Sequence, residues 1–278
     1  MLDQTETTHF RTCPLCEAMC GLAITVRGQE IMSIRGDSDD PFSRGHICPK
    51  GAALQDIHTD PERLRHPVRR TAAGWERIGW DEAYAEVVAG IKAVQAQHGS
   101  DAVGVYQGNP SVHNLGTSLF SPAFVKSLKT KNRFSATSVD QLPHQFVAYL
   151  MYGHQLLLPI PDLDRTDFLL ILGANPAVSN GSLMTAPDVK RRLKAIRQRG
   201  GKIVVIDPRR NETAELADEH HFIRPGSDAL LVLALLHTIL GEGLAKPDRL
   251  AAFTDGLELL EPLVADSTPE RVAPQIGI

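Results

Sequence analysis

The four cysteines of the chain are the residues whose type and spacing most directly indicate chemistry. Cys13, Cys16 and Cys20 fall within eight residues, and Cys48 follows after 27 others. Cysteines of a hydrophobic core would be scattered, and a disulfide framework is expected in a secreted chain, for which no export signal is visible. The clustering therefore favours a metal site.

The order of the cysteines distinguishes between metals. A zinc ribbon usually has two separated Cys-x₂-Cys pairs, whereas this sequence has Cys-x₂-Cys-x₃-Cys, a long gap and a single cysteine. Three closely spaced thiolates suit three corners of a cubane, and the distant fourth closes it. We predict a [4Fe–4S] cluster, with a zinc site and inert thiols as alternatives.

The segment between Cys20 and Cys48 must position these thiols. Apolar residues alternate from Leu22 to Val26 and resume at Ile31 after a Gly-Gln-Glu turn, which predicts a β-hairpin. A loop over 37–44 would then return the chain toward the other cysteines. We expect a small cluster-binding domain over residues 1–65.

The remainder, residues 66–278, alternates between helical and strand patterns. We expect a helix from Trp80 with Asp81 as its N-cap, and helices over about 115–129 and 143–152. Strands are expected at 102–106, 168–172, 202–206 and 222–223, with a helix near Pro187 between the middle two and a nearly all-apolar helix, buried on both sides, over 229–240.

This alternation predicts an α/β fold, in which the small β-hairpin domain precedes a doubly wound, mostly parallel sheet flanked by helices. In such sheets ligands bind where the strands end. The segments expected at those ends are Gly173, Ala174, Asn175 and Pro176; Asp207, Pro208, Arg209 and Arg210; and Gly226, Ser227 and Asp228.

These strand-end segments suit a nucleotide-bearing cofactor. Glycines let the backbone approach a phosphate, helix N-termini supply amides, and arginine contacts phosphate through two hydrogen bonds. The carboxylate of Asp228 could accept paired hydrogen bonds from a guanine edge. Each segment alone is also typical of an ordinary turn, loop or cap.

Composition excludes several function classes. The net charge of −4 leaves no broad basic field for nucleic acid, and no apolar stretch reaches the ~18 residues of a membrane span. The first residues resemble neither a secretory signal nor a twin-arginine signal, which makes the cytoplasm the expected compartment. A length of 278 residues suggests about two domains.

Together, the motifs make the sequence similar to the N-terminal part of the prokaryotic molybdopterin oxidoreductases, which include formate dehydrogenases, nitrate reductases and dimethyl sulfoxide reductase. The motifs are Cys13-x₂-Cys16-x₃-Cys20-x₂₇-Cys48-Pro-Lys50-Gly51 and the segments 172–176, 205–210, 212–214 and 224–228, in the family's order. Because family chains are much longer, the resemblance implies a fragment, or a second chain that supplies the remaining domains, rather than a complete enzyme.

The resemblance also implies cofactors and roles. The four cysteines would hold a [4Fe–4S] cluster, Lys50 would lie between this cluster and a pterin, and the strand-end turns would hold a molybdopterin guanine dinucleotide. In the family, two such cofactors chelate molybdenum or tungsten for two-electron redox of a small substrate such as formate or nitrate. Electrons pass through the cluster to a partner protein.

The protein ligand of the metal is the weakest part of the resemblance. The corresponding segment, 133–144, contains no cysteine. Asp140 is the first candidate ligand and Ser138 the second, with His144 as a candidate acid–base neighbour; Asp140 equally suits a turn or helix cap. The substrate therefore stays open. The alternatives are a non-catalytic iron–sulfur electron-transfer or assembly module and a zinc-stabilised α/β binding protein.

Overall fold

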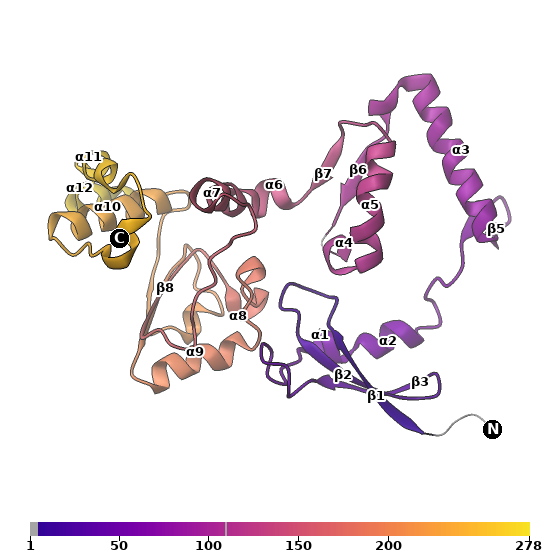
Figure 1. Ribbon diagram of the computed structural model, residues 1–278, viewed down its shortest axis with the longest axis horizontal. Coiled ribbons are helices and arrows are strands. Elements are labelled where there is room, and N and C mark those ends of the chain that lie inside the picture. Colours follow the sequence, from indigo (N-terminus) through magenta and orange to yellow (C-terminus); the bar gives the residue numbers. More distant parts are fainter. Residues whose placement is uncertain (1–4, 109) are drawn as a thin grey trace. The chain divides into compact units, whose positions relative to one another are not determined.

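The computed structural model describes residues 5–108 and 110–278. It divides into two compact units (Figure 1). The first comprises the described residues up to 160 together with 182–188, and the second comprises 161–181 together with 189–278.

The first unit begins with an antiparallel sheet of three strands, in the order β1 (Glu6–Thr12), β2 (Gly21–Arg27) and β3 (Glu30–Gly36). The predicted β-hairpin is confirmed as β2 and β3. Strand β1 was not predicted, because its side chains are exposed throughout and its sequence lacks a hydrophobic alternation. Its edge pairing with β2 places Cys13 at the end of the sheet.

Two short helices, a hairpin and a long helix follow. They are α1 (Pro49–Ala52), α2 (Leu54–Thr59), β4 (Val68–Thr71), β5 (Gly74–Arg77) and α3 (Trp80–His98). Helix α3 begins at Trp80 as expected, but the predicted N-cap was wrong, because the cap is Gly79 and not Asp81. Asp81 lies instead in the first turn, where its negative charge favours the helix dipole.

The first unit continues as α/β structure. Its elements are η1 (Ser100–Ala102), β6 (Val105–Gln107), α4 (Pro110–His113), α5 (Leu115–Ser127), β7 (Arg133–Ser135), α6 (Thr137–Asp140), α7 (Leu142–Tyr152) and the later turn η2 (Ser182–Met184). Strands β6 and β7 pair in parallel. The predicted helices over 115–129 and 143–152 are confirmed as α5 and α7.

The second unit has a parallel three-stranded sheet in the order β10 (Glu219–His221), β9 (Lys202–Ile206) and β8 (Phe168–Leu172). The bounds predicted for β8 and β9 are confirmed. The strand predicted at 222–223 was wrong, since β10 ends at His221, and Ile223 is instead buried in the core. In sequence, helices α8 (Pro176–Ser179) and α9 (Val189–Gln198) lie between β8 and β9, and η3 (Ala214–Leu216) lies between β9 and β10.

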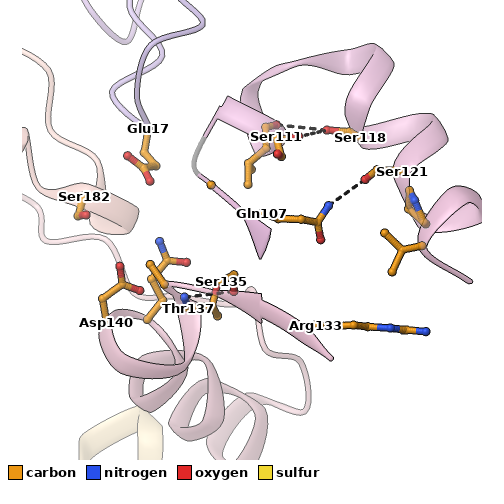
Figure 2. Close-up of a pocket in the computed structure, with 16 residues that line it drawn as sticks. Glu17, Gln107, Ser111, Ser118, Ser121, Arg133, Ser135, Thr137, Asp140 and Ser182 are labelled. Carbon is orange, nitrogen blue, oxygen red and sulfur yellow. Dashed lines mark hydrogen bonds between the residues drawn. The ribbon is translucent and has the colours of Figure 1, made fainter. Parts of the chain in front are cut away.

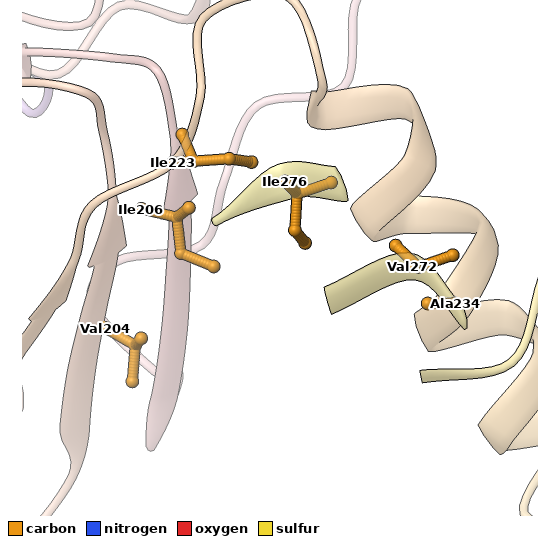
Figure 3. Packing of buried hydrophobic residues seen from close by; sticks show 6 residues of the cluster. All are labelled: Val204, Ile206, Ile223, Ala234, Val272 and Ile276. Atoms are coloured by element: carbon orange, nitrogen blue, oxygen red, sulfur yellow. The ribbon is translucent and has the colours of Figure 1, made fainter. Parts of the chain in front are cut away.

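The core of the second unit lies between this sheet and the C-terminal helices (Figure 3). Helix α10 (Asp228–Gly241) and α12 (Pro269–Ile276) supply apolar side chains opposite β9, and η4 (Asp248–Ala252), η5 (Leu257–Leu259) and α11 (Leu260–Val264) connect them. The buried cluster comprises Val204, Ile206, Ile223, Ala234, Val272 and Ile276.

Helix α10 differs from the expectation that it is buried on both sides. Ala234 is its buried residue among those described, whereas Val232, Leu235 and Ile239 are about two-fifths exposed. One face of the helix packs against the core, and the opposite apolar face is left partly open to solvent. Its apolar composition therefore predicted the helix but not the number of its packed faces.

The α/β class, the β-hairpin and the parallel strands are thus confirmed, with the described parallel strands in two separate sheets. In the part of the chain that the structure describes, no helix combines the length and apolar character needed to cross a bilayer.

Candidate functional site

The loop between β1 and β2 carries three of the four cysteines. The last residue pair of the two strands is Thr12 and Gly21, so the loop begins and ends at the same edge of the sheet. The amide of Cys13 donates a 2.9 Å hydrogen bond to the carbonyl oxygen of Cys20, which closes the loop. Cys16 accepts a further bond from the amide of Met19, which has a φ of +46°. The strand pairing thereby holds three cysteines in one compact loop.

The fourth cysteine joins this group through helix α1. Cys48 is the residue that precedes the helix. A Cβ atom added to Gly51 would lie 2.9 Å from Cγ1 of Ile47 and 3.7 Å from Sγ of Cys13. The missing side chain of Gly51 therefore lets the helix approach the cysteine loop.

The electrostatics of the thiols indicate what this group can bind. Burial, together with the neighbouring Cys13, Cys16 and Cys48, raises the pKa of Cys20 to about 11. Burial likewise raises the pKa of Cys13, which the charge of Lys50 opposes. Crowded, buried thiolates need positive charge nearby, which bound iron ions supply. The residues therefore fit a cluster.

Among the described residues, no group of three or more histidine, cysteine or carboxylate side chains has the arrangement of a single-ion site. A cubane spreads its ligands over four iron atoms, each bound by one thiolate.

A cavity of about 770 Å³ lies within the first unit, beside the cysteine loop (Figure 2). Glu17 of that loop, Asp140 at the end of α6 and Ser182 contribute to its wall. Most other polar groups there are hydroxyls and amides, from Gln107, Ser111, Ser118, Ser121, Ser135, Thr137 and Gln141. The wall is thus rich in neutral hydrogen-bonding groups.

The charged groups of this cavity are unevenly placed. The Arg133 side chain points away from Asp140, and its Nε donates a 3.2 Å hydrogen bond to the carbonyl oxygen of Thr130.

Of the residues predicted from the sequence, Asp140 lines the cavity, whereas Ser138 and His144 are exposed and do not. Glu17 was missed, although its place between Cys16 and Cys20 was an available signal.

The second unit brings two of the predicted nucleotide turns together. Leu172, Ile206 and His221 are in register at the carboxyl ends of the three parallel strands. The amide of Gly173 donates a 2.9 Å hydrogen bond to Ile206, and the amide of Asp207 a 3.1 Å bond to His221. The turns 173–176 and 207–210 therefore leave the same edge of the sheet.

This edge has backbone that a phosphate can approach. Gly173 of this edge has a φ of +58°, and Gly226 of the third predicted turn has a φ of +80°; apart from chain neighbours, no described atom lies within 4 Å of a Cβ added to either residue. Arg209 and Arg210 are exposed. Open backbone and exposed guanidinium groups suit an anionic ligand.

Other predicted residues of these turns bond within the protein. Asp207 is buried, and its Oδ1 accepts a 2.7 Å hydrogen bond from the amide of Arg209. The buried hydroxyl of Ser227 donates to the carbonyl oxygen of Arg224 at 2.6 Å, and Asp228 begins α10. Ala174 is half-buried, Pro208 is exposed, and Pro176 begins α8. These contacts shape the turns.

Comparisons with known proteins agree with both parts of this description. Residues 7–59 match the family model described as "Molybdopterin oxidoreductase Fe4S4 domain", and residues 63–258 match "Molybdopterin oxidoreductase". The thiosulfate reductase molybdopterin-containing subunit of Salmonella typhimurium is 29% identical over 96% of this chain and 34% of its own length. Formate dehydrogenase H of Escherichia coli is 29% identical over 96% of this chain and 37% of its own length.

A solved structure extends the similarity to the fold. Acetylene hydratase from Pelobacter acetylenicus matches with a TM-score of 0.75 and 26% identity, over 96% of this chain and 36% of that one. The chain thus spans about a third of the length of these relatives. Because the family model matches more than half of the sequence, the chain belongs to the molybdopterin oxidoreductase family and includes its Fe4S4 domain.

Proposed function

We propose that the chain holds the [4Fe–4S] cluster and part of the molybdopterin guanine dinucleotide site of a molybdenum- or tungsten-dependent oxidoreductase. The substrate would be a small molecule such as formate or nitrate, in a two-electron reaction. The observation that carries the proposal is the grouping of the four cysteines with Lys50, in a chain of this family. When bound, the metal would supply the two-electron redox step and the cluster single-electron transfer.

In this proposal Cys13, Cys16, Cys20 and Cys48 bind the cluster. The charge of Lys50 acts on the Cys13 thiol, which supports a place for its ammonium group between the cluster and a pterin. The same positive charge would favour the arrival of an electron on the cluster. Lys50 is exposed on the helix that follows Cys48, so it can reach a group outside the cysteine loop.

The strand-end turns of the second unit would hold the guanine dinucleotide. The turn 173–176 offers backbone to a phosphate, and Arg209 and Arg210 offer guanidinium groups. The turn 226–228 carries Asp228, whose carboxylate would accept hydrogen bonds from guanine. The shared edge of the parallel strands supports the grouping of the first two turns.

Asp140 would be the protein ligand of the metal. It lines the cavity that also includes Glu17 of the cysteine loop. The hydroxyls and amides of the wall would orient a polar substrate through hydrogen bonds. Ser138, the second candidate, and His144, the candidate acid–base neighbour, have less support because neither lines the cavity.

The proposal includes partners and a compartment. An electron-transfer protein would exchange electrons with the cluster, and the remaining two-thirds of the relatives' length would come from further sequence or from a separate chain. The expected compartment is the cytoplasm.

Metal analysis after anaerobic reconstitution tests the proposal. About four irons per chain, with molybdenum or tungsten and guanine nucleotide, is the expected result. Iron without pterin would indicate an electron-transfer or assembly module, and zinc alone would indicate a zinc-stabilised binding protein. Cys48→Ala should lose the iron, whereas the control His46→Ala should retain it; an unchanged iron content in Cys48→Ala would reject the ligand assignment.

A spectroscopic comparison tests Asp140. In the loaded protein, Asp140→Ala should change the molybdenum EPR or X-ray absorption signal because a ligand oxygen is removed. Ser138→Ala, two residues away and outside the cavity wall, serves as the control and should leave the signal unchanged. Identical spectra for Asp140→Ala and the unmodified protein would exclude Asp140.

A further inference from the structure

We propose that Thr213 and Asn211 are positioning residues that join the turns after β8 and β9 into one preorganised nucleotide-binding edge. The inference rests on the proposed function of these turns. Neither residue needs to touch the nucleotide. Both act through Asn175 of the first turn and Asp207 of the second.

Thr213 connects the two turns from a fully buried position. Its exposed fraction is 0%. Its hydroxyl donates a 2.8 Å hydrogen bond to Oδ1 of Asn175 and accepts a 3.0 Å bond from the amide of Ala177. One hydroxyl in the segment after β9 therefore holds both the side chain of the first turn and the helix that follows it.

Asn211 holds Thr213 in place. It is 3% exposed, and its Nδ2 donates a 2.9 Å hydrogen bond to Oδ2 of Asp207. Its Oδ1 accepts bonds from the amides of Thr213 at 3.0 Å and Ala214 at 2.9 Å. A continuous series of hydrogen bonds thus runs from Asp207 through Asn211 and Thr213 to Asn175, buried as far as Thr213 and part-buried at Asn175.

Glu212, between these two residues, makes the corresponding links on the exposed side. Its Oε2 accepts a 2.7 Å hydrogen bond from Nδ2 of Asn175 and lies 3.6 Å from a guanidinium nitrogen of Arg209. The buried Thr213 therefore holds Oδ1 of Asn175, and the exposed Glu212 holds its Nδ2. Glu212 also places Arg209 beside Asn175. The two groups have a set orientation before a ligand arrives.

This arrangement has a consequence for binding. A site whose polar groups are already held loses less conformational entropy when its ligand binds. Removal of the Thr213 hydroxyl would leave the Ala177 amide and Oδ1 of Asn175 without that partner, which is costly for groups this close to the core. The first turn would lose its fixed orientation, and nucleotide affinity would fall.

Titration calorimetry with guanosine diphosphate, on the whole 278-residue chain, tests the inference. We expect Thr213→Val to weaken binding about tenfold or more, and Thr213→Ser, which keeps the hydroxyl, to bind within about twofold of the unmodified protein. Thr213→Cys, which replaces the hydroxyl by a weakly hydrogen-bonding thiol and lacks the γ-methyl group, should give an intermediate affinity, and it replaces Thr213→Val if circular dichroism shows that the valine variant does not fold.

Thr130→Val is the matched control. Thr130 is also buried, at 3% exposed, and its hydroxyl donates to the carbonyl oxygen of Val103 and accepts from the amide of Asn132. Its removal deletes the same kinds of bond in the first unit. Thr130→Val should lose comparable stability and keep its affinity for guanosine diphosphate, which separates positioning from general destabilisation.

Hydrogen exchange followed by NMR gives a readout that needs no ligand. The amide of Ala177 and the side-chain amide of Asn175 should exchange faster in Thr213→Val and recover in Thr213→Ser. Unchanged exchange together with unchanged affinity would overturn the inference. If the unmodified chain does not bind guanosine diphosphate, the proposed function of the turns fails, and the exchange rates still decide whether Thr213 joins them.

Discussion

The side-chain hydroxyl of Thr185 donates a 2.7 Å hydrogen bond to the backbone carbonyl oxygen of Glu17, 168 residues earlier in the sequence. Asp188 makes a second such link, with its Oδ1 3.7 Å from Nδ1 of His46. The segment 182–188 interrupts the second unit in sequence but belongs to the first unit in space. It therefore supports the loop that carries the cysteines.

Removal of the Thr185 hydroxyl should weaken this support. Thr185 is 8% exposed, so Thr185→Val leaves a part-buried carbonyl without its partner, at a cost of about 1–3 kcal/mol. We expect the reconstituted variant to lose iron to a chelator several-fold faster. Thr130→Val, a buried threonine away from the loop, is the control, and equal rates for both variants would contradict the prediction.

The raised pKa of Cys20 makes the stability of the metal-free chain depend on pH. Burial and the neighbouring cysteines raise this pKa from 9.0 to about 11. Between these values the unfolded chain loses the proton that the folded chain retains, so the unfolding free energy falls as pH rises. Urea unfolding of the reduced, metal-free chain from pH 7 to 11 should show this loss. The Cys20→Ser variant should show a weaker pH dependence; an equal slope would refute the assignment.

Gly36 is predicted to tolerate no side chain. A Cβ atom added there would lie 2.1 Å from the carbonyl oxygen of Gly45, and a backbone atom cannot turn aside as a side chain can. We expect Gly36→Ala to destabilise the cysteine-bearing region by about 1–3 kcal/mol. Gly90→Ala, within α3 and with no described atom within 4 Å, should instead stabilise by about 0.5–1 kcal/mol. Chemical denaturation curves for both variants check the opposite signs.

Ile203 of strand β9 should contribute strongly to the stability of the second unit. It is 0% exposed, so Ile203→Ala removes buried methyl groups and leaves a cavity, at a cost of about 2–5 kcal/mol. The control Ile57→Ala changes a side chain that is 55% exposed and should cost about 0.5 kcal/mol or less. Thermal unfolding of the two variants distinguishes them, and equal shifts would show that β9 is not central to the core.

The sequence predicted elements best where a hydrophobic pattern matched a single structural solution. The apolar runs 168–172 and 202–206 are strands with the expected bounds. The central strand β9 buries both faces, as its continuous apolar run predicts, whereas Phe168 and Leu170 of the edge strand β8 stay exposed. Strand β1 carries no such pattern, since its side chains are exposed and its pairing depends on backbone hydrogen bonds to β2. Backbone pairing leaves little trace in residue types.

For the cofactor sites, the spacing of the four cysteines indicated the cluster, and the motif order indicated the family that the comparisons show. The pterin contacts and the role of Asp140 stay predictions. Thr213 was missed as an individual residue because a buried threonine has no chemical signature in sequence. Its importance comes from the two partners that its hydroxyl joins.

By itself, the sequence determined the type of site and the strands that lead to it, because ligand spacing and hydrophobic runs are local properties. The tertiary structure alone decided which polar residues support the site and which face outward. The carboxylate of Asp207 is buried and accepts hydrogen bonds from Arg209 and Asn211, whereas Glu212 stays exposed between Asn175 and Arg209. The register of β8 and β9 brings these distant residues together, and hydrogen-bond partners are chosen only after that pairing has formed.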